Sequence, residues 1–220
     1  MLSNFNSIIK IGITDDHPAY VSGITDIING FEEFKVVLQA GNSHELFRKL
    51  EVAEEIPDIL LLDISMPPGK NGYEVAKELR RTWPQVKILA MSMYNSEEAI
   101  IRMLGNGAKG FLRKNVKPKE IADALRSMAN KGYYDSDLVS EDMFERAKKC
   151  PPEDLNPREM EYLTLCCQAY TDKEIAAKMN IALNTVHWHR QDLCEKLKVT
   201  NKTGLMFYAM RTGLFPFTDF

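Results

Sequence analysis

The sequence predicts an α/β protein with a doubly wound sheet of five parallel strands, followed by a small all-α domain. Two observations support this fold class. Between residues 8 and about 131, five short apolar runs alternate with amphipathic stretches of helical period, the pattern of consecutive βα units in a covered parallel sheet. From about residue 153 onward, only helical patterns follow. With 220 residues, the chain is long enough for two domains, each with its own core.

The predicted strands are short apolar runs rich in β-branched residues. They span residues 8–14, 35–40, 58–63, 86–92 and 110–114. Helix boundaries fall between them, and Pro18 suits a first helical turn. Ser96 suits the cap of a helix that ends near Gly105, and Pro118 suits the start of the next helix. These five units predict a first domain over residues 1–131.

The alternation stops after residue 131. Residues 132–152 contain one short helix candidate, roughly residues 140–149. In it and directly before it, four apolar residues recur at helical spacing: Val139, Met143, Phe144 and Ala147. Pro151 and Pro152 close this candidate helix. We expect the segment to be an ordered linker between two domains.

Four helices are predicted in the last domain, residues 153–220. Asn156 and Thr171 each stand three residues before a glutamate, which is the spacing of a capping box. Asn184 is the expected cap of the third helix, and the fourth helix is expected to stop near Gly213. Because the connection between the second and third helices is short, the pattern predicts a helix-turn-helix.

The composition is that of an ordinary globular protein. Four cysteines form neither a CxxC pair nor a zinc-site spacing, as expected for free thiols in a reducing cytoplasm. The amino terminus does not resemble a signal peptide, and no stretch approaches the roughly 18 apolar residues of a membrane span. We therefore expect a cytoplasmic protein that does not bind membranes. Residues 151–220 carry 8 Lys and Arg against 9 Asp and Glu, so bulk charge does not indicate a nucleic-acid partner.

Polar side chains follow four of the predicted strands at their carboxyl ends. Asp15 and Asp16 follow the first strand and Asp63 ends the third. Ser92 ends the fourth strand and Lys114 the fifth. In a sheet of order 2-1-3-4-5, ligands bind beyond this edge, between strands one and three. Each residue alone is more often a turn, cap or surface residue, but five matching positions favour a site. Three carboxylates there suit a hard divalent cation such as Mg²⁺.

These residues carry a resemblance to a known family. Their order, with the motif Asp-x-x-Met-Pro from Asp63 to Pro67 and "GAKGFL" before Lys114, resembles the receiver domain of two-component response regulators, which has a flavodoxin-like fold. Residues 155–199 resemble the LuxR-type helix-turn-helix of the NarL/FixJ family. Together the two resemblances cover nearly the whole chain.

The resemblance implies a phosphoacceptor and a metal site. Asp63 would accept a phosphoryl group from a sensor histidine kinase. Asp16 and Asp63, with the carbonyl of Ser65, would hold Mg²⁺, and Asp15 would act mainly through water. This division of roles makes chemical sense, because a carboxylate attacks an anionic phosphoryl group only when cations offset the repulsion.

The resemblance also implies a switch. Ser92 and Lys114 would bind the phosphoryl oxygens. Phosphorylation adds roughly −1.5 to −2 of charge. Pulling Ser92 toward that charge would open space beneath the fourth strand for Phe111, the aromatic side chain expected to move with the switch.

The third helix of the last domain is the predicted recognition helix. Val186, Leu193 and Leu197 fall on one face, with His189 or Arg190 completing it, and this face should pack against the first two helices. The remaining surface would contact DNA. The alternative is a solvated face with one stray tryptophan, although a large exposed aromatic patch is unusual. The expected DNA-binding residues are Thr171, Lys173, Thr185, His187, Trp188, Gln191 and Lys202.

The sequence therefore predicts a response regulator. Mg²⁺-dependent phosphorylation of Asp63 would control homodimerisation and sequence-specific binding to double-stranded DNA. A first alternative, slightly favoured by the neutral tail, is a receiver whose helical tail binds a protein. A second is a phosphatase that forms an aspartyl phosphate. Such enzymes have Asp-x-Asp after the first strand, whereas this chain has adjacent aspartates, so we expect no enzyme activity beyond self-phosphorylation and autodephosphorylation at Asp63.

Overall fold

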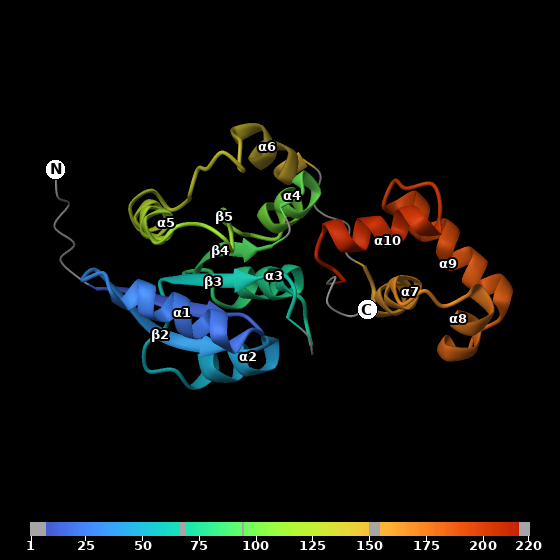
Figure 1. The fold of residues 1–220 in the computed structure, drawn as a ribbon, viewed down its shortest axis with the longest axis horizontal. Coiled ribbons are helices and arrows are strands. Elements are labelled where there is room, and N and C mark those ends of the chain that lie inside the picture. Colours follow the sequence, from blue (N-terminus) through green and yellow to red (C-terminus); the bar gives the residue numbers. More distant parts are fainter. Residues whose placement is uncertain (1–7, 67–68, 94, 150–154, 216–220) are drawn as a thin grey trace. The chain divides into compact units, whose positions relative to one another are not determined.

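The chain divides into two compact units, Met1–Pro151 and Pro152–Phe220. The structure is a computed structural model that describes residues 8–66, 69–93, 95–149 and 155–215 (Figure 1). Among these residues, none of the helices combines the length and the apolar character needed to cross a lipid bilayer.

A sheet of five parallel strands forms the centre of the first unit, in the order β2-β1-β3-β4-β5. The strands are β1 (Ile9–Thr14), β2 (Phe34–Ala40), β3 (Ile59–Asp63), β4 (Lys87–Ser92) and β5 (Gly110–Arg113). The predicted doubly wound sheet is confirmed, and each strand begins and ends within one residue of its predicted run. Every residue of β3 is buried, which explains its unbroken apolar sequence.

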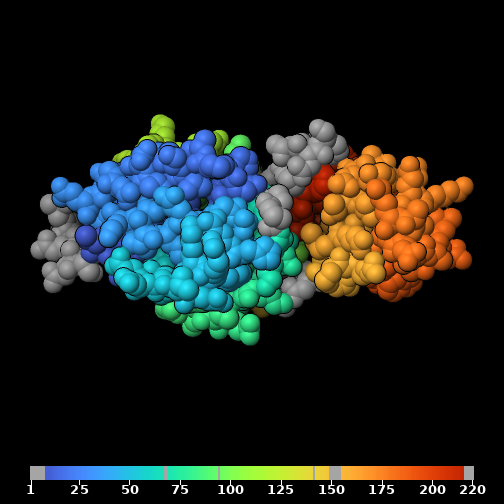
Figure 2. Space-filling view, turned by 90° about the horizontal axis from the view of Figure 1, so that it is seen from below, coloured from blue at the N-terminus to red at the C-terminus, as the bar shows by residue number. Residues whose placement is uncertain are grey.

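Five helices connect and cover these strands (Figure 1). They are α1 (Pro18–Asn29), α2 (Ser43–Val52), α3 (Gly72–Thr82), α4 (Glu97–Gly105) and α5 (Pro118–Lys131). The predicted helix starts are confirmed at both prolines and at Ser96, whose side chain accepts a hydrogen bond from the amide of Ala99 at 3.2 Å. Apolar residues of α1 and α5 share one buried core with β1 and β3. In the space-filling view, α1, β2 and α2, in blue and cyan, form one continuous side of this unit (Figure 2).

A sixth helix, α6 (Glu141–Lys149), forms at the predicted short-helix candidate. It packs against α4 within the first unit, with Ala147 buried and Arg146 ion-paired to Glu97 (Figure 1). The ring of Phe144 meets that of Tyr133 edge-on, with centroids 6.4 Å apart. Residues 150–152, including the prolines expected to close the helix, lie outside the described residues.

The described residues of the second unit, 155–215, form four helices around their own core. They are α7 (Pro157–Cys167), α8 (Asp172–Met179), α9 (Leu183–Lys196) and α10 (Lys202–Arg211). Both predicted capping boxes are present, from Asn156 to Glu159 and from Thr171 to Glu174. The helix-turn-helix connection from α8 to α9 is as short as predicted, and it turns at Asn180, which adopts a left-handed conformation with φ of 53°.

The predicted cap of α9 is wrong. The helix begins one residue before Asn184, and the capping position is Ala182, whose backbone is extended and whose side chain makes no capping hydrogen bond. The left-handed turn at Asn180 redirects the chain early enough for the helix to begin at Leu183. Tertiary geometry has therefore overridden the local capping preference of asparagine.

Candidate functional site

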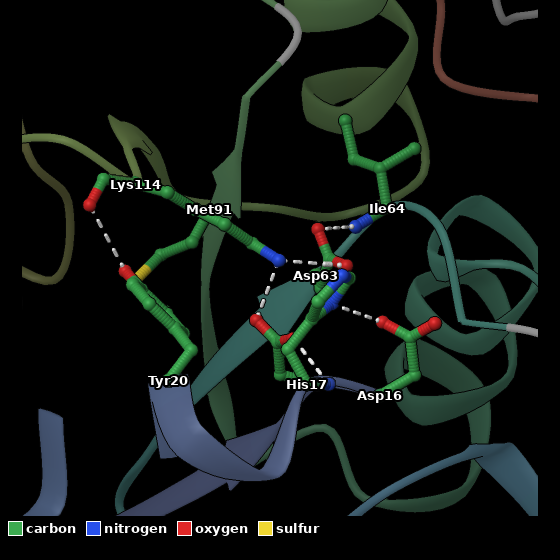
Figure 3. Close-up of polar contacts among 8 residues, drawn as sticks. Asp16, His17, Tyr20, Asp63, Ile64, Met91 and Lys114 are labelled. Carbon is green, nitrogen blue, oxygen red and sulfur yellow. Dashed lines mark hydrogen bonds and ion pairs between the residues drawn. The ribbon is translucent and has the colours of Figure 1, made fainter. Parts of the chain in front are cut away.

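Three charged side chains meet where β1, β3 and β5 end at the same edge of the sheet (Figure 3). The ammonium of Lys114 lies 2.6 Å from Asp15 Oδ2 and 3.0 Å from Asp63 Oδ2. The Lys114 side chain is only 9% exposed, and both carboxylates are almost completely buried. One cation therefore joins two carboxylates in a site largely shielded from water.

Asp16 and His17 extend this cluster (Figure 3), and the His17 side chain is 63% exposed. His17 Nδ1 lies 2.7 Å from Asp16 Oδ1 and 3.2 Å from Asp15 Oδ1, and its main-chain amide donates to Asp15 Oδ1 at 3.0 Å. One potential ligand atom from each of Asp15, Asp16, His17 and Asp63 lies within 4.8 Å of the others. Sequence reasoning did not include His17, and its position beside the two aspartates is the only signal for it.

The carboxylates of this cluster fit a hard cation. Asp15 Oδ2 and Asp16 Oδ1 are buried, and no hydrogen bond from the described part of the chain reaches either atom beyond their ion-pair contacts. Buried oxygens with unused lone pairs are the ligands that Mg²⁺ takes, alongside water and phosphate. Ser65, half-buried, lies two residues after Asp63 on the same segment.

The environment of Asp63 changes its acidity. Burial raises the pKa of Asp63 to about 7, opposed by the Lys114 ammonium and reinforced by the Asp15 carboxylate. The amide of Ile64 donates to Asp63 Oδ1 at 2.8 Å and so favours the ionised form. Burial lowers the pKa of Lys114, but Asp63 and Asp15 outweigh it and the net direction is upward. Lys114 is therefore a permanent cation beside an aspartate whose charge depends on its surroundings.

Ser92 and Phe111 lie behind this edge. Ser92 ends β4, is completely buried, and its carbonyl accepts a hydrogen bond from the Lys114 amide at 3.0 Å. Phe111, also completely buried, lies in β5 opposite Ala90 of β4. The structure thus brings Lys114, directly after β5, next to Ser92 at the end of the neighbouring strand β4. Pro67 of the predicted motif is outside the described residues.

Gly72 is a structural requirement of the site that the sequence did not reveal. Its amide donates to the carbonyl of Ile64 at 2.8 Å, so that α3 begins directly against the end of β3. A β-carbon at this position would lie 2.2 Å from the main-chain oxygen of Asp63. Only glycine allows this approach.

The surface of α9 separates into the two predicted faces. Val186, Leu193 and Leu197 are buried in the core of the second unit. Both candidates for completing this face take part, because His189 stacks on Tyr162 and Arg190 donates to Asp172. On the outer face, three of the expected DNA-binding residues are exposed: His187, Trp188 and Gln191. Trp188 is 59% exposed.

Comparisons with known proteins agree with both halves of this geometry. Residues 11–126 match the family model of the response regulator receiver domain, and residues 153–209 match that of the bacterial regulatory proteins of the LuxR family. The chain is a response regulator of the NarL/FixJ type.

The relatives of this response regulator match it along nearly its whole length. The oxygen regulatory protein NreC of Staphylococcus haemolyticus is 33% identical over 219 residues, which cover 95% of this chain and 100% of the relative. NreC of Staphylococcus carnosus is 32% identical with the same coverage. RcsB from Salmonella enterica serovar Typhimurium, bound to promoter P1flhDC in the presence of the phosphomimetic BeF₃⁻, is 26% identical with a TM-score of 0.62, over 92% of this chain and 98% of that chain.

The remaining predicted DNA contacts of this response regulator differ in their surroundings. Lys173 is exposed, and Thr185 is half-buried near the start of α9. The Thr171 hydroxyl is engaged in its capping box. The ammonium of Lys202 donates to the carbonyl of Tyr170 at 2.6 Å and lies 3.2 Å from Asp172 Oδ1. Lys202 is thus bound within its own unit, which the sequence could not indicate.

Proposed function

We propose that this response regulator receives a phosphoryl group on Asp63 from a sensor histidine kinase in the cytoplasm. Phosphorylation would favour a homodimer that binds a specific sequence of double-stranded DNA and so regulates transcription. The observation that carries the proposal is the Lys114 ammonium, held between Asp63 and Asp15 at the carboxyl edge of the sheet.

In the proposed reaction, a carboxylate oxygen of Asp63 attacks the phosphorus of a phosphohistidine. The bond from phosphorus to the imidazole nitrogen breaks, and its electron pair leaves with that nitrogen. Lys114 neutralises the transferred oxygens. Asp16, Asp63, the carbonyl of Ser65 and, through water, Asp15 would hold Mg²⁺, which when bound offsets the negative charge of the two reactants.

The transferred group would then act on the buried residues behind the site. Ser92, which ends β4 and is buried, would donate a hydrogen bond to a phosphoryl oxygen and so shift toward the phosphoryl group. Phe111 would move into the space that this shift of Ser92 opens. Because β4 leads into α4, and α4 packs against α6, a change at Ser92 has a physical route to the segment preceding the second unit.

The second unit supplies the surfaces for dimerisation and DNA binding. Phe207 on α10 is 60% exposed, which suits a helix that pairs with a second copy of the chain. RcsB, the structural neighbour, has been described as two dimers bound to two parallel DNAs, with 26% identity and a TM-score of 0.57 over 93% of this chain and 99% of that chain. Two recognition helices about 34 Å apart would read a palindromic site.

Phosphorylation is tested with a small donor such as acetyl phosphate and Mg²⁺. Asp63 should be the modified residue by mass spectrometry, and Asp63→Asn, which has nearly the same shape, should abolish the modification without unfolding the protein. Removing Mg²⁺ or introducing Asp16→Ala should slow the reaction severely because repulsion is no longer offset. Unchanged modification of Asp63→Asn would refute the assignment.

The test of DNA binding must also decide whether the second unit binds a protein instead. That alternative is favoured by the contacts that hold Arg190, Lys196 and Lys202 within the unit. After selection of a site from random DNA, Trp188→Ala should weaken binding to that site more than to random DNA, because it removes a contact at base edges. Lys173→Ala, a matched exposed control, should weaken both equally through a lost phosphate contact. A gel shift that detects no DNA complex at all would favour the protein-binding alternative.

A further inference from the structure

We infer that Tyr20 is the positioning residue of Lys114, holding the lysine at both ends so that its ammonium stays against Asp63. This inference rests on the proposed phosphorylation of Asp63. Tyr20 lies in the first turns of α1 and points toward the end of β5 (Figure 3).

The first contact is between the tyrosine ring and the ammonium. Lys114 Nζ lies 5.1 Å from the centroid of the Tyr20 ring, within the range of a cation–π interaction. Asp15 and Asp63 contact the same nitrogen at 2.6 and 3.0 Å. Because the ammonium is nearly buried, water screens these attractions little. The ring therefore adds an uncharged third partner that helps keep the ammonium beside the phosphoacceptor.

The second contact holds the main chain of the same lysine. The Tyr20 hydroxyl donates to the carbonyl oxygen of Lys114 at 3.3 Å. Met91 Sδ lies 3.8 Å from the same hydroxyl. On the other side, the Lys114 amide donates to Ser92. Burial raises the pKa of the Tyr20 hydroxyl, and the nearby aspartates add to the rise, so it remains a donor at neutral pH. The turn after β5 is thus fixed by one bond from α1 and one to β4.

These contacts matter because lysine is long and flexible. Its four-carbon stem can place the ammonium in solvent as readily as in the site, and the loss of rotamer entropy opposes a single placement. A partner that holds both ends confines the ammonium before the phosphoryl donor arrives. The Asp63 carboxylate alone cannot provide this confinement throughout the reaction, because its attacking oxygen becomes part of an acyl phosphate and the negative charge moves to the transferred phosphoryl oxygens.

The ring and the hydroxyl can be removed separately in the full-length protein. Tyr20→Phe keeps the ring and removes the bond to the Lys114 carbonyl, so we expect phosphorylation by acetyl phosphate to slow about 2- to 3-fold. Tyr20→Leu removes both contacts and should slow it about 5- to 20-fold. Phe31→Leu is the matched control, because Phe31 is also a half-buried ring on the same core but stacks on Arg126, far from Lys114 in the fold. It should leave the rate unchanged.

A double-mutant cycle separates positioning from a structural effect. In a Lys114→Ala background, Tyr20→Leu should cause no further slowing, because the residue through which Tyr20 acts is gone. Equal slowing by Tyr20→Leu in both backgrounds would overturn the inference, as would no slowing in the wild-type background.

A spectroscopic measurement tests the same contact without any reaction. With ¹⁵N-labelled lysine, the buried Lys114 ammonium should give a distinct resonance that is assigned by its loss in Lys114→Ala. This resonance should persist in Tyr20→Phe and shift or broaden in Tyr20→Leu. An unchanged resonance in Tyr20→Leu would refute the positioning role. Failure of the wild-type protein to become phosphorylated on Asp63, with the resonance behaving as expected, would instead refute the proposed function alone.

Discussion

At the scale of single residues, Gly72 shows how closely α3 approaches the end of β3, where Asp63 lies. A β-carbon there would lie 2.2 Å from the oxygen of Asp63 and 2.7 Å from the Cα of Ile64, and neither backbone atom can rotate away. We expect Gly72→Ala to lower the free energy of unfolding by about 3 kcal/mol, because β3 or α3 must shift. Urea denaturation followed by circular dichroism measures this change.

Gly23 provides the matched control for this substitution. It lies in the middle of α1, is exposed, and an added β-carbon would meet no atom within 4 Å. Gly23→Ala should therefore raise the free energy of unfolding by about 0.5–1 kcal/mol, since alanine loses less backbone entropy in a helix. If both variants were as stable as the wild type, the close approach at Gly72 would not be a constraint of the fold.

Individual site residues were predictable to different degrees. Asp15, Asp63 and Lys114 follow strands directly, so the order of the strands alone brings them to one edge. Tyr20 was not predictable, because its contact with Lys114 depends on the rotation of α1 about its axis and on the path of the turn after β5. The engagement of Lys202 by Asp172 likewise depends on how α10 packs in the second unit.

At the scale of elements, the start of α2 depends on a carboxylate. Glu45 Oε2 accepts a hydrogen bond from the Gly41 amide at 2.8 Å, and Oε1 pairs with Lys49 at 2.8 Å. These contacts, the Gly41 amide first, hold the pKa of Glu45 below its ordinary value of 4.5. A lowered folded pKa means that the carboxylate stabilises the fold above about pH 4.5, and that this stabilisation is lost as the pH falls through the folded pKa.

Glu45→Gln should therefore reduce stability at pH 7 but not in acid. The expected loss at pH 7 is small, about 0.5 kcal/mol, because the side chain is partly exposed and solvent screens the pair. The difference from the wild type should shrink below pH 4.5 and vanish once Glu45 is protonated in the folded protein. Thermal unfolding of both proteins from pH 3 to pH 7 measures this stability difference. A difference that grows toward low pH would contradict the stabilising role of the Glu45 carboxylate.

Helix boundaries show where local sequence is sufficient and where it is not. The caps at Asn156 and Thr171 were predictable because each helix start is decided by its own capping box. The start of α9 was not, because the left-handed turn at Asn180 decides it from outside the helix. The capping preference of Asn184 is a local energy of about 1 kcal/mol, which tertiary packing readily exceeds.

At the scale of the whole molecule, few cations are available to bind the phosphates of DNA. At least four basic side chains of the second unit are held by neighbours: Arg158 by Glu161, Arg190 by Asp172, Lys196 by Glu159 and Lys202 by Tyr170 and Asp172. Phosphate contacts must then come largely from exposed lysines and from main-chain amides at the starts of α8 and α9. Amide contacts supply no released counterion of their own, so they add affinity with little salt dependence.

The salt dependence of DNA binding by the proposed dimer should therefore be shallow. Each phosphate neutralised by a lysine contributes about 0.9 to the slope of log affinity against log salt concentration. With Lys173, Lys178 and Lys198 exposed in each copy, we expect a slope of about −4 to −6 for the dimer on its selected site. Fluorescence anisotropy across a salt series measures this slope.

Two variants locate the source of that slope. Lys173→Ala should make it shallower by about 1.8 for the dimer, since each copy loses one phosphate contact. Lys119→Ala, which removes an exposed lysine from α5 in the first unit, should leave it unchanged. A slope near −10 would mean that the engaged cations leave their partners on DNA. An equal effect of both variants would mean that the first unit also contacts DNA. Intradomain ion pairs would then not limit the electrostatics of binding.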